Sequence, residues 1–338
     1  MSPSPTLSLC MIVKNEANCL PRCLESAANH VDEIVVVDTG SEDDTVAIAE
    51  RFTARVFHYT WHDHFAAARN EALRHATGDW LVVLDADEVI EPAGWETIRK
   101  AIADTTMEGF YLTQRNYGAQ RTAQDWVPVR EKTAYSGEYT GYRANPILRL
   151  FRNREDIHYK GRVHEVVDRT LHPDKRERLD VAIHHYMDED PTKPVAQRQR
   201  EYLRLIEQGK QEGMDGRLHT AAGSIRLHYL EDFPGAIEHL QQAVALGYEV
   251  QANSESIAEA RYRMGDTAGA YRDYLALHES GYRSFNLCNN LANLAVRKGR
   301  RPFAADLLEQ ALGLGVADDE ARSRLQHNIR YLRANPEG

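Results

Sequence analysis

Residues 80–88 of the chain read Trp80-Leu81-Val82-Val83-Leu84-Asp85-Ala86-Asp87-Glu88. Five apolar residues followed at once by acidic ones predict a buried strand that ends in a polar loop. The carboxylates of Asp85 and Asp87 stand two residues apart, which suits a hard divalent cation that also contacts phosphate oxygens. An acidic strand-to-loop turn without a ligand is the alternative, and this stretch alone favours neither.

The residues that precede this stretch alternate between strand and helix patterns. Apolar runs rich in β-branched residues predict strands at 7–13, 33–38, 54–59 and 80–84, with helices over 18–28, 41–51 and 64–75. Such an alternation indicates a mostly parallel sheet covered on both faces. Ligands of these sheets bind beyond the carboxyl ends of the strands, where Asp38, Asp85 and Asp87 fall.

The middle of the chain is less regular. Residues 105–141 are rich in tyrosine and glycine, and a strand is expected at 147–152. A turn at 153–156 and a returning strand at 157–167 follow in this prediction. From residue 198 onward the pattern is helical in every window.

The last third of the sequence contains a repeat. The stretches that begin at Leu230, Met264 and Lys298 align with an offset of 34 residues. Glycine recurs at 247, 281 and 315, and alanine at 236, 270 and 304. A 34-residue period with small residues at fixed positions resembles the tetratricopeptide repeat, a helix–turn–helix unit that stacks into a solenoid. An irregular helical bundle is the alternative. We therefore expect an α/β domain at 1–190 and a helical linker with repeats at 191–338.

Composition limits the kinds of partner. The 338 residues are 42% apolar and 27% charged, with a net charge of −10 and a pI near 5.8, which is typical of a globular protein. A chain with this acidic balance is not expected to bind nucleic acid. No apolar run is long enough for a membrane-spanning helix, and the first residues do not resemble a signal peptide. Four cysteines without a CxxC motif fit a reducing cytoplasm.

Four ordered motifs resemble the inverting family 2 glycosyltransferases of the GT-A fold, over roughly residues 7–190. They are Met11-Ile12-Val13-Lys14-Asn15-Glu16, the segment from Val36 to Thr45, Ala68-Arg69-Asn70-x-Ala72, and the segment from Gly78 to Glu88. The resemblance implies a GT-A, Rossmann-like domain, a nucleotide-sugar donor such as a uridine diphosphate sugar, and Mg²⁺ or Mn²⁺. It also implies where single residues act: Asp87 on the metal, and Glu16, Asp38, Arg69, Asn70 and Asp85 at the donor.

A second cluster, Gly161-Arg162-Val163-His164-Glu165, is similar to a stretch of bacterial glycosyltransferases that carry tetratricopeptide repeats. Glu165 is the candidate general base, because an acceptor hydroxyl or thiol must lose a proton as it attacks. An ion pair between Glu165 and an arginine such as Arg162 is the alternative. His184 is a candidate metal ligand, which the resemblance to GT-A enzymes implies. A packed histidine is the alternative there, and His185 is its open neighbour.

The pairing of a transferase with repeats resembles the S-glycosyltransferases that modify bacteriocin peptides. This resemblance implies a peptide or protein acceptor, with the tyrosine-rich segment 111–142 and the repeats as its binding surface. Assembly of lipopolysaccharide or another envelope glycan is the alternative, and an inactive sugar-nucleotide-binding scaffold is the alternative of another class. Repeats commonly mediate self-association, so a homodimer is also expected. The identity of the sugar and of the acceptor atom stays open.

Overall fold

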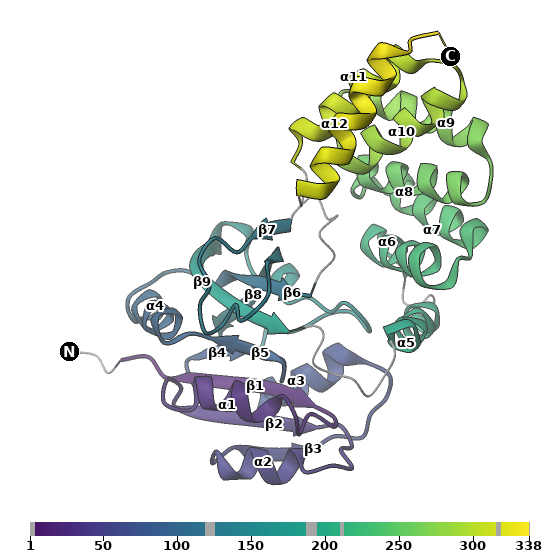
Figure 1. The fold of residues 1–338 in the computed structure, drawn as a ribbon. Helices are drawn as coiled ribbons and strands as arrows, with labels where there is room; N and C mark the ends of the chain where they lie inside the picture. Colours follow the sequence, from purple (N-terminus) through teal and green to yellow (C-terminus); the bar gives the residue numbers. More distant parts are fainter. Residues whose placement is uncertain (1–3, 119–125, 187–194, 210–212, 316–318, 338) are drawn as a thin grey trace. The chain divides into compact units, whose positions relative to one another are not determined.

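The structure of the protein, a computed structural model, describes residues 4–118, 126–186, 195–209, 213–315 and 319–337. It divides into two compact units, Met1–Lys193 and Pro194–Gly338. The first unit is built around a β-sheet and the second consists of helices (Figure 1).

One nine-stranded sheet organises the N-terminal unit. Its strands follow the order β3-β2-β1-β4-β8-β6-β9-β5, and β7 pairs with β8. The half that contains β1 to β4 is parallel, as expected from the alternating pattern. The strands are β1 (Leu7–Val13), β2 (Glu33–Asp38), β3 (Arg55–His58), β4 (Trp80–Val83), β5 (Glu88–Ile90), β6 (Gly109–Tyr117), β7 (Trp126–Pro128), β8 (Gly141–Arg152) and β9 (Arg176–Tyr186).

Helices cover both faces of this sheet (Figure 1). Successive side chains of a strand point to opposite faces, so Leu9 and Met11 join one core while Cys10 joins the other. The first core is covered by α1 (Leu20–Ala27), α2 (Thr45–Arg51) and α4 (Pro92–Ala103), and the second by α3 (Phe65–His75). The predicted α/β architecture is confirmed, and the layers leave the carboxyl ends of the parallel strands to carry loops.

The prediction of a strand at 157–167 is wrong. This segment holds only an isolated bridge between Lys160 and Val166. Gly161 and His164 have φ angles of 107° and 52°, and a backbone in this left-handed region cannot continue a strand. The segment therefore crosses the face beside α3 as an irregular loop, followed by short 3-10 turns η1 (Asp168–Thr170) and η2 (Pro173–Lys175).

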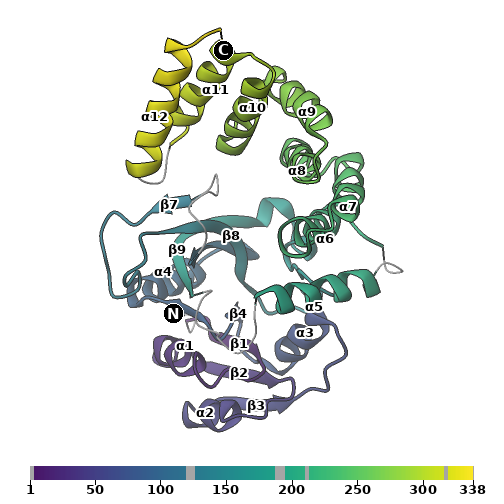
Figure 2. The same ribbon diagram turned by 45° about the vertical axis from the view of Figure 1, so that its right-hand side comes forward.

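The C-terminal unit consists of successive antiparallel helices that follow one another along an arc (Figure 2). The predicted 34-residue repeat corresponds to the pairs α7–α8, α9–α10 and α11–α12. The helices are α5 (Val195–Gln208), α6 (Gly216–Ile225), the π-helical turn η4 (Arg226–Leu230), α7 (Phe233–Ala245), α8 (Val250–Arg263), α9 (Thr267–Glu279), α10 (Phe285–Arg297), α11 (Arg301–Gly313) and α12 (Asp319–Ala334).

The recurring small residues have the structural roles that the repeat requires. Ala236, Ala270 and Ala304 are fully buried where neighbouring helices meet. Gly247, Gly281 and Gly315 have φ angles of 72°, 90° and 100° just after the ends of α7, α9 and α11, where a residue without Cβ is favoured. These features fit a tetratricopeptide-like solenoid. None of the helices in the described part of the chain has the length and hydropathy that a bilayer-spanning helix needs.

Candidate active site

The segment Asp85-Ala86-Asp87, here called the acidic elbow, lies between β4 and β5. Glu88, the first residue of β5, is fully buried and holds the elbow in shape. Its Oε2 accepts the backbone N–H of Asp85 at 2.8 Å, and its own N–H donates to the carbonyl of Asp85 at 3.1 Å. Gln114 of β6 donates to the other carboxylate oxygen of Glu88 at 2.6 Å. Burial raises the pKa of Glu88, while the positive charge of Arg149 opposes this change.

Asp85 lies between two buried arginines. Arg69 of α3 donates to its Oδ1 at 2.8 Å, and Arg149 of β8 donates to its Oδ2 at 2.7 Å. Arg149 also lies 3.4 Å from Oε1 of Glu88. Burial alone would raise the pKa of Asp85, but the two guanidinium groups outweigh it and hold the pKa well below its usual range. Asp85 is therefore ionised, and both of its carboxylate oxygens are engaged by the protein.

Arg69 also connects the elbow to Glu165. Its Nε donates to Oε1 of Glu165 at 2.5 Å, and the Glu165 side chain is only 11% exposed. The arginine that pairs with Glu165 is thus Arg69, whereas Arg162 donates to the carbonyl of Asp63 at 3.0 Å. The Arg69 side chain therefore links the candidate base Glu165 to Asp85 of the acidic elbow, although the two residues are eighty positions apart in the sequence.

Asn70 anchors the loop that carries Glu165. Its Nδ2 donates to the carbonyl of Tyr159 at 3.0 Å, and its Oδ1 accepts the N–H of Tyr159 at 2.8 Å. The amide is thereby engaged at both ends by one backbone residue. Its contact in the structure is with this loop, so Asn70 contributes to the site by holding the segment 157–167 against α3.

Asp87 contacts His185 and not His184. Oδ2 of Asp87 lies 3.1 Å from Nε2 of His185, and Nδ1 of His185 lies 2.6 Å from Oδ1 of Asn116 on β6. Burial would lower the pKa of His185, but the hydrogen bond and charge of Asp87 raise it to about 9. The Asp87 side chain is 33% exposed and so is that of Asp85, so both carboxylates of the elbow reach solvent.

His184 lies on the other side of the same strand, because neighbouring side chains of β9 point to opposite faces. Its ring is 2% exposed and stacks on Tyr117, with centroids 5.8 Å apart and planes at 7°. Nδ1 of His184 is 2.9 Å from the hydroxyl oxygen of Tyr117, and burial lowers the pKa of His184 to about 4. The structure thus places the predicted ligand His184 within a cluster of aromatic rings, away from the acidic elbow.

Asp38 and Glu16 occupy the same carboxyl edge of the sheet. Asp38 ends β2, is 4% exposed, and accepts the backbone N–H groups of Gly40 and Ser41 at 3.1–3.2 Å. Glu16 follows β1, and its N–H donates to the hydroxyl of Thr45 at 2.7 Å. The loops after β1 and β2 are therefore tied together beside the elbow's edge of the sheet.

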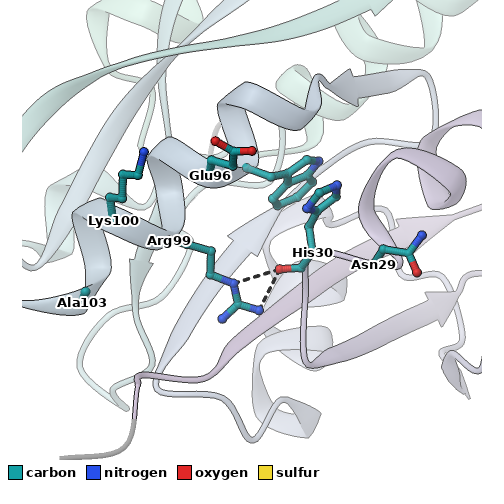
Figure 3. A pocket seen from close by; sticks show the side chains of 7 residues that line it. Asn29, His30, Glu96, Arg99, Lys100 and Ala103 are labelled. Atoms are coloured by element: carbon teal, nitrogen blue, oxygen red, sulfur yellow. Dashed lines mark hydrogen bonds between the residues drawn. The ribbon is translucent and has the colours of Figure 1, made fainter. Parts of the chain in front are cut away.

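A hollow of about 510 Å³ lies elsewhere, between α4 and the loop before β2 (Figure 3). This loop enters β2 at its amino end, so the hollow belongs to the opposite edge of the parallel strands from the elbow. Arg99 donates to the carbonyl of His30 at 2.7 and 2.9 Å and pairs with Asp32 at 2.8 Å. Arg99 at this hollow already has structural partners, and we assign no ligand to the hollow.

The donor atoms at the elbow fit a divalent cation that is completed by its substrate. No group of three His, Cys, Asp or Glu side chains in the described ranges is arranged as a ready metal cage. Asp87 supplies carboxylate oxygen, and His185 supplies imidazole nitrogen. Mg²⁺ and related ions are commonly held by one or two carboxylates together with water and substrate phosphate oxygens. The residues that are present therefore suit such an ion.

The sequence interpretation missed three residues of the cluster. Arg149 and Glu88 each stand within or beside apolar strand residues, and a charge in a buried strand is a usable signal for a buried ion pair. Asn116 gives no comparable local signal. It reaches His185 only because β6 and β9 pair in parallel with these two residues in register.

The sequence of the N-terminal unit is similar to known glycosyltransferases. Residues 8–163 match the family model described as Glycosyl transferase family 2. A TPR repeat-containing protein of Synechococcus elongatus is 42% identical over 165 residues, which cover 49% of this chain and 36% of that protein. The SPbeta prophage-derived glycosyltransferase SunS of Bacillus subtilis is 30% identical over 166 residues, which cover 48% of this chain and 35% of SunS. The matched part thus spans about a third of these relatives' length.

Among solved structures, S. aureus TarS 1-349 in complex with UDP-GlcNAc is 16% identical, with a TM-score of 0.48 over 81% of this chain and 91% of that one. The match over residues 8–163 supports the predicted family for the N-terminal part of the chain. The chain combines this domain with a C-terminal unit of helical repeats.

Proposed function

We propose that the protein transfers a sugar from a nucleoside diphosphate donor to a peptide or protein side chain, with inversion at the anomeric carbon. One observation carries this proposal: Asp85 is fixed between Arg69 and Arg149, beside an accessible Asp87–His185 pair, at the carboxyl edge of a family 2 domain. Ligands of such sheets bind at this edge. A uridine diphosphate sugar is the donor that the family resemblance suggests.

In this proposal Asp87 and His185 hold Mg²⁺ or Mn²⁺, and His185 takes the place first considered for His184. The bound ion supplies Lewis acidity toward the negative charge that develops on the diphosphate. Asp38 and Glu16 bind the nucleoside part of the donor from the neighbouring loops. Asp85 follows β4, the strand next to β1 in the sheet, and the two arginines fix the orientation of its carboxylate toward the donor in this proposal.

Glu165 accepts the proton of the acceptor group as its oxygen or sulfur attacks the anomeric carbon. The bond from that carbon to the diphosphate oxygen breaks in the same step, and the electron pair leaves with the diphosphate. Arg69 orients Glu165 through the 2.5 Å hydrogen bond, and Asn70 keeps the loop of Glu165 against α3. Arg69 and Asn70, which the sequence analysis expected at the donor, thus act in this proposal mainly through Glu165.

A peptide acceptor is supported by two features of the chain. Helical repeats present extended surfaces for other chains. Tyrosine rings also gather around His184, three of them half-buried, and aromatic side chains offer a large contact area at a low entropic cost. This cluster contains Tyr117, Tyr135, Tyr139, Tyr142 and Tyr186.

Two further expectations belong to the same proposal. Self-association through the repeats predicts a mass of two chains in light scattering at micromolar concentration, and a mass of one chain would contradict it. None of the four cysteines forms a disulfide and all are buried, which supports a reducing cytoplasm as the working compartment.

The proposal is tested by measuring diphosphate release from a panel of nucleotide sugars, with Mn²⁺, with Mg²⁺ and with a chelator. Candidate peptides are then examined for a mass increase of one sugar. Asp87→Ala should abolish metal-dependent turnover, while Glu96→Ala, an exposed carboxylate on α4, should leave it unchanged. Wild-type turnover by Asp87→Ala in the presence of metal would refute the assignment. Transfer only to lipid-linked glycans would replace the peptide acceptor with the envelope alternative.

A further inference from the structure

Asn116 contacts His185, and no step above uses this contact. It lies on β6, beside His185 of β9 in the parallel register of these strands. Its side-chain amide bridges two neighbours. Nδ2 donates to the backbone carbonyl of Arg143 on β8 at 3.3 Å, and Oδ1 lies 2.6 Å from Nδ1 of His185.

The chemistry of these neighbours determines which atom faces which. A backbone carbonyl only accepts hydrogen bonds, so the amide group that faces Arg143 must be the NH₂. The amide oxygen of Asn116 then faces His185, and because that oxygen only accepts, Nδ1 of His185 must carry a hydrogen. In the neutral ring this leaves the lone pair on Nε2, the nitrogen that faces Asp87 at 3.1 Å.

We propose that Asn116 is a positioning residue that fixes the tautomer and ring plane of His185, so that Nε2 is presented to a divalent cation beside Asp87. This inference rests on the proposed function, because it assigns the ion to this pair. Histidines that bind metal usually donate their other N–H to a carbonyl, a carboxylate or water, and this outer contact orients the ring.

The location of Asn116 suits this role. Both residues stand on paired strands inside the sheet, where the backbone positions are fixed more tightly than on loops. The anchor on the β8 carbonyl prevents the amide from rotating, since the opposite orientation would place two acceptors 3.3 Å apart. No other residue in the described ranges contacts Nδ1 of His185 by hydrogen bond.

The test measures Mn²⁺ binding to the full chain by electron paramagnetic resonance, with UDP as the probe and without any acceptor. Asn116→Ala removes the acceptor for Nδ1, and Asn116→Asp keeps an oxygen in its place. Removal of such an outer contact typically costs roughly 10–100-fold in metal affinity. We expect that loss for Asn116→Ala, and affinity within a few-fold of wild type for Asn116→Asp. Asn29→Ala, at an exposed asparagine before β2, serves as the matched control.

A second readout separates positioning from general destabilisation. Electron spin-echo modulation from a directly bound imidazole ¹⁴N should be present in wild type and Asn116→Asp. It should be absent in His185→Ala and weakened in Asn116→Ala, with the tryptophan emission spectrum unchanged. Wild-type Mn²⁺ affinity and nitrogen modulation in Asn116→Ala, together with loss of both in His185→Ala, would overturn this inference and leave the metal site standing. No Mn²⁺ binding by the wild-type protein with UDP would overturn both.

Discussion

Replacing Arg149 with methionine tests whether the elbow is held by charge. The guanidinium lies 2.7 Å from Asp85 and 3.4 Å from Glu88, and its side chain is 5% exposed. Opposite charges about 4 Å apart attract by roughly 4 kcal/mol at an effective dielectric constant of about 20. Removing one partner of a buried pair costs about 3–5 kcal/mol, because the other charge is left uncompensated. We therefore expect Arg149→Met to lower the unfolding free energy of the N-terminal unit by about 3–5 kcal/mol at pH 8.

The pH dependence gives the sign of the effect. In the wild type the depressed pKa of Asp85 contributes stability that is lost only as the pH falls below the unfolded value near 4. In Arg149→Met, burial is no longer opposed by this cation. The pKa of Glu88, which is already raised, then rises further, and the folded variant binds more protons than the unfolded chain. The deficit relative to wild type should therefore shrink as the pH falls from 8 to 5.

Urea unfolding followed by tryptophan fluorescence measures this deficit selectively, because all four tryptophans lie between residues 61 and 126. Arg154→Met is the matched control. Arg154 also pairs with two carboxylates, those of Glu108 and Asp156, but it does so at the surface, where ion pairs contribute little. A loss below about 1 kcal/mol in Arg149→Met, or a loss that stays constant from pH 8 to pH 5, would refute the reasoning.

Three further predictions concern single residues. Gly281→Ala should destabilise the helical unit by roughly 1–2 kcal/mol, measured by circular dichroism, because its φ is 90°; Gly313→Ala, at the helical end of α11 with open space around it, should be neutral or stabilising. His184→Ala should lower the melting temperature and leave the Mn²⁺ affinity near that of wild type. His185→Ala should lower the Mn²⁺ affinity and leave the melting temperature nearly unchanged; loss of Mn²⁺ affinity in both variants would contradict the assignment. Glu165→Gln should reduce kcat far more than donor affinity, whereas equal losses would indicate a binding role.

The parts of the fold that the sequence predicted are those encoded locally. Strands β1 to β4 and the helices between them follow from apolar runs and helical periodicity. The repeats follow from glycine and alanine at a fixed period. The sheet beyond β4 depends on pairings between distant strands, such as β6 with β9, and no local pattern encodes that register. The prediction of a strand at 157–167 was wrong for a related reason: the apolar residues of this segment pack against α3 and the sheet, but they do so from an irregular loop.

The candidate site divides in the same way. Asp85 and Asp87 are adjacent in sequence and were found from their spacing. Their partners come from α3, β8 and β9, so the sequence showed the acids without the arginines that hold them. The choice between His184 and His185 depends on one residue of strand register, because a shift by one position exchanges the two faces of β9.

The charges of the completed cluster make a last prediction about donor binding. With Glu88 counted as ionised and His185 as protonated, four carboxylates face three cations, which leaves a net charge of −1. A diphosphate, which is itself negative, is repelled by this cluster unless a divalent cation is present. We therefore expect calorimetry to show tight UDP binding with Mn²⁺ and at least tenfold weaker binding with a chelator. Asp87→Ala should have nearly the same weak affinity in both conditions. Equal UDP affinity with and without metal in the wild type would contradict this charge balance. The groups counted are Asp85, Asp87, Glu88, Glu165, Arg69, Arg149 and His185.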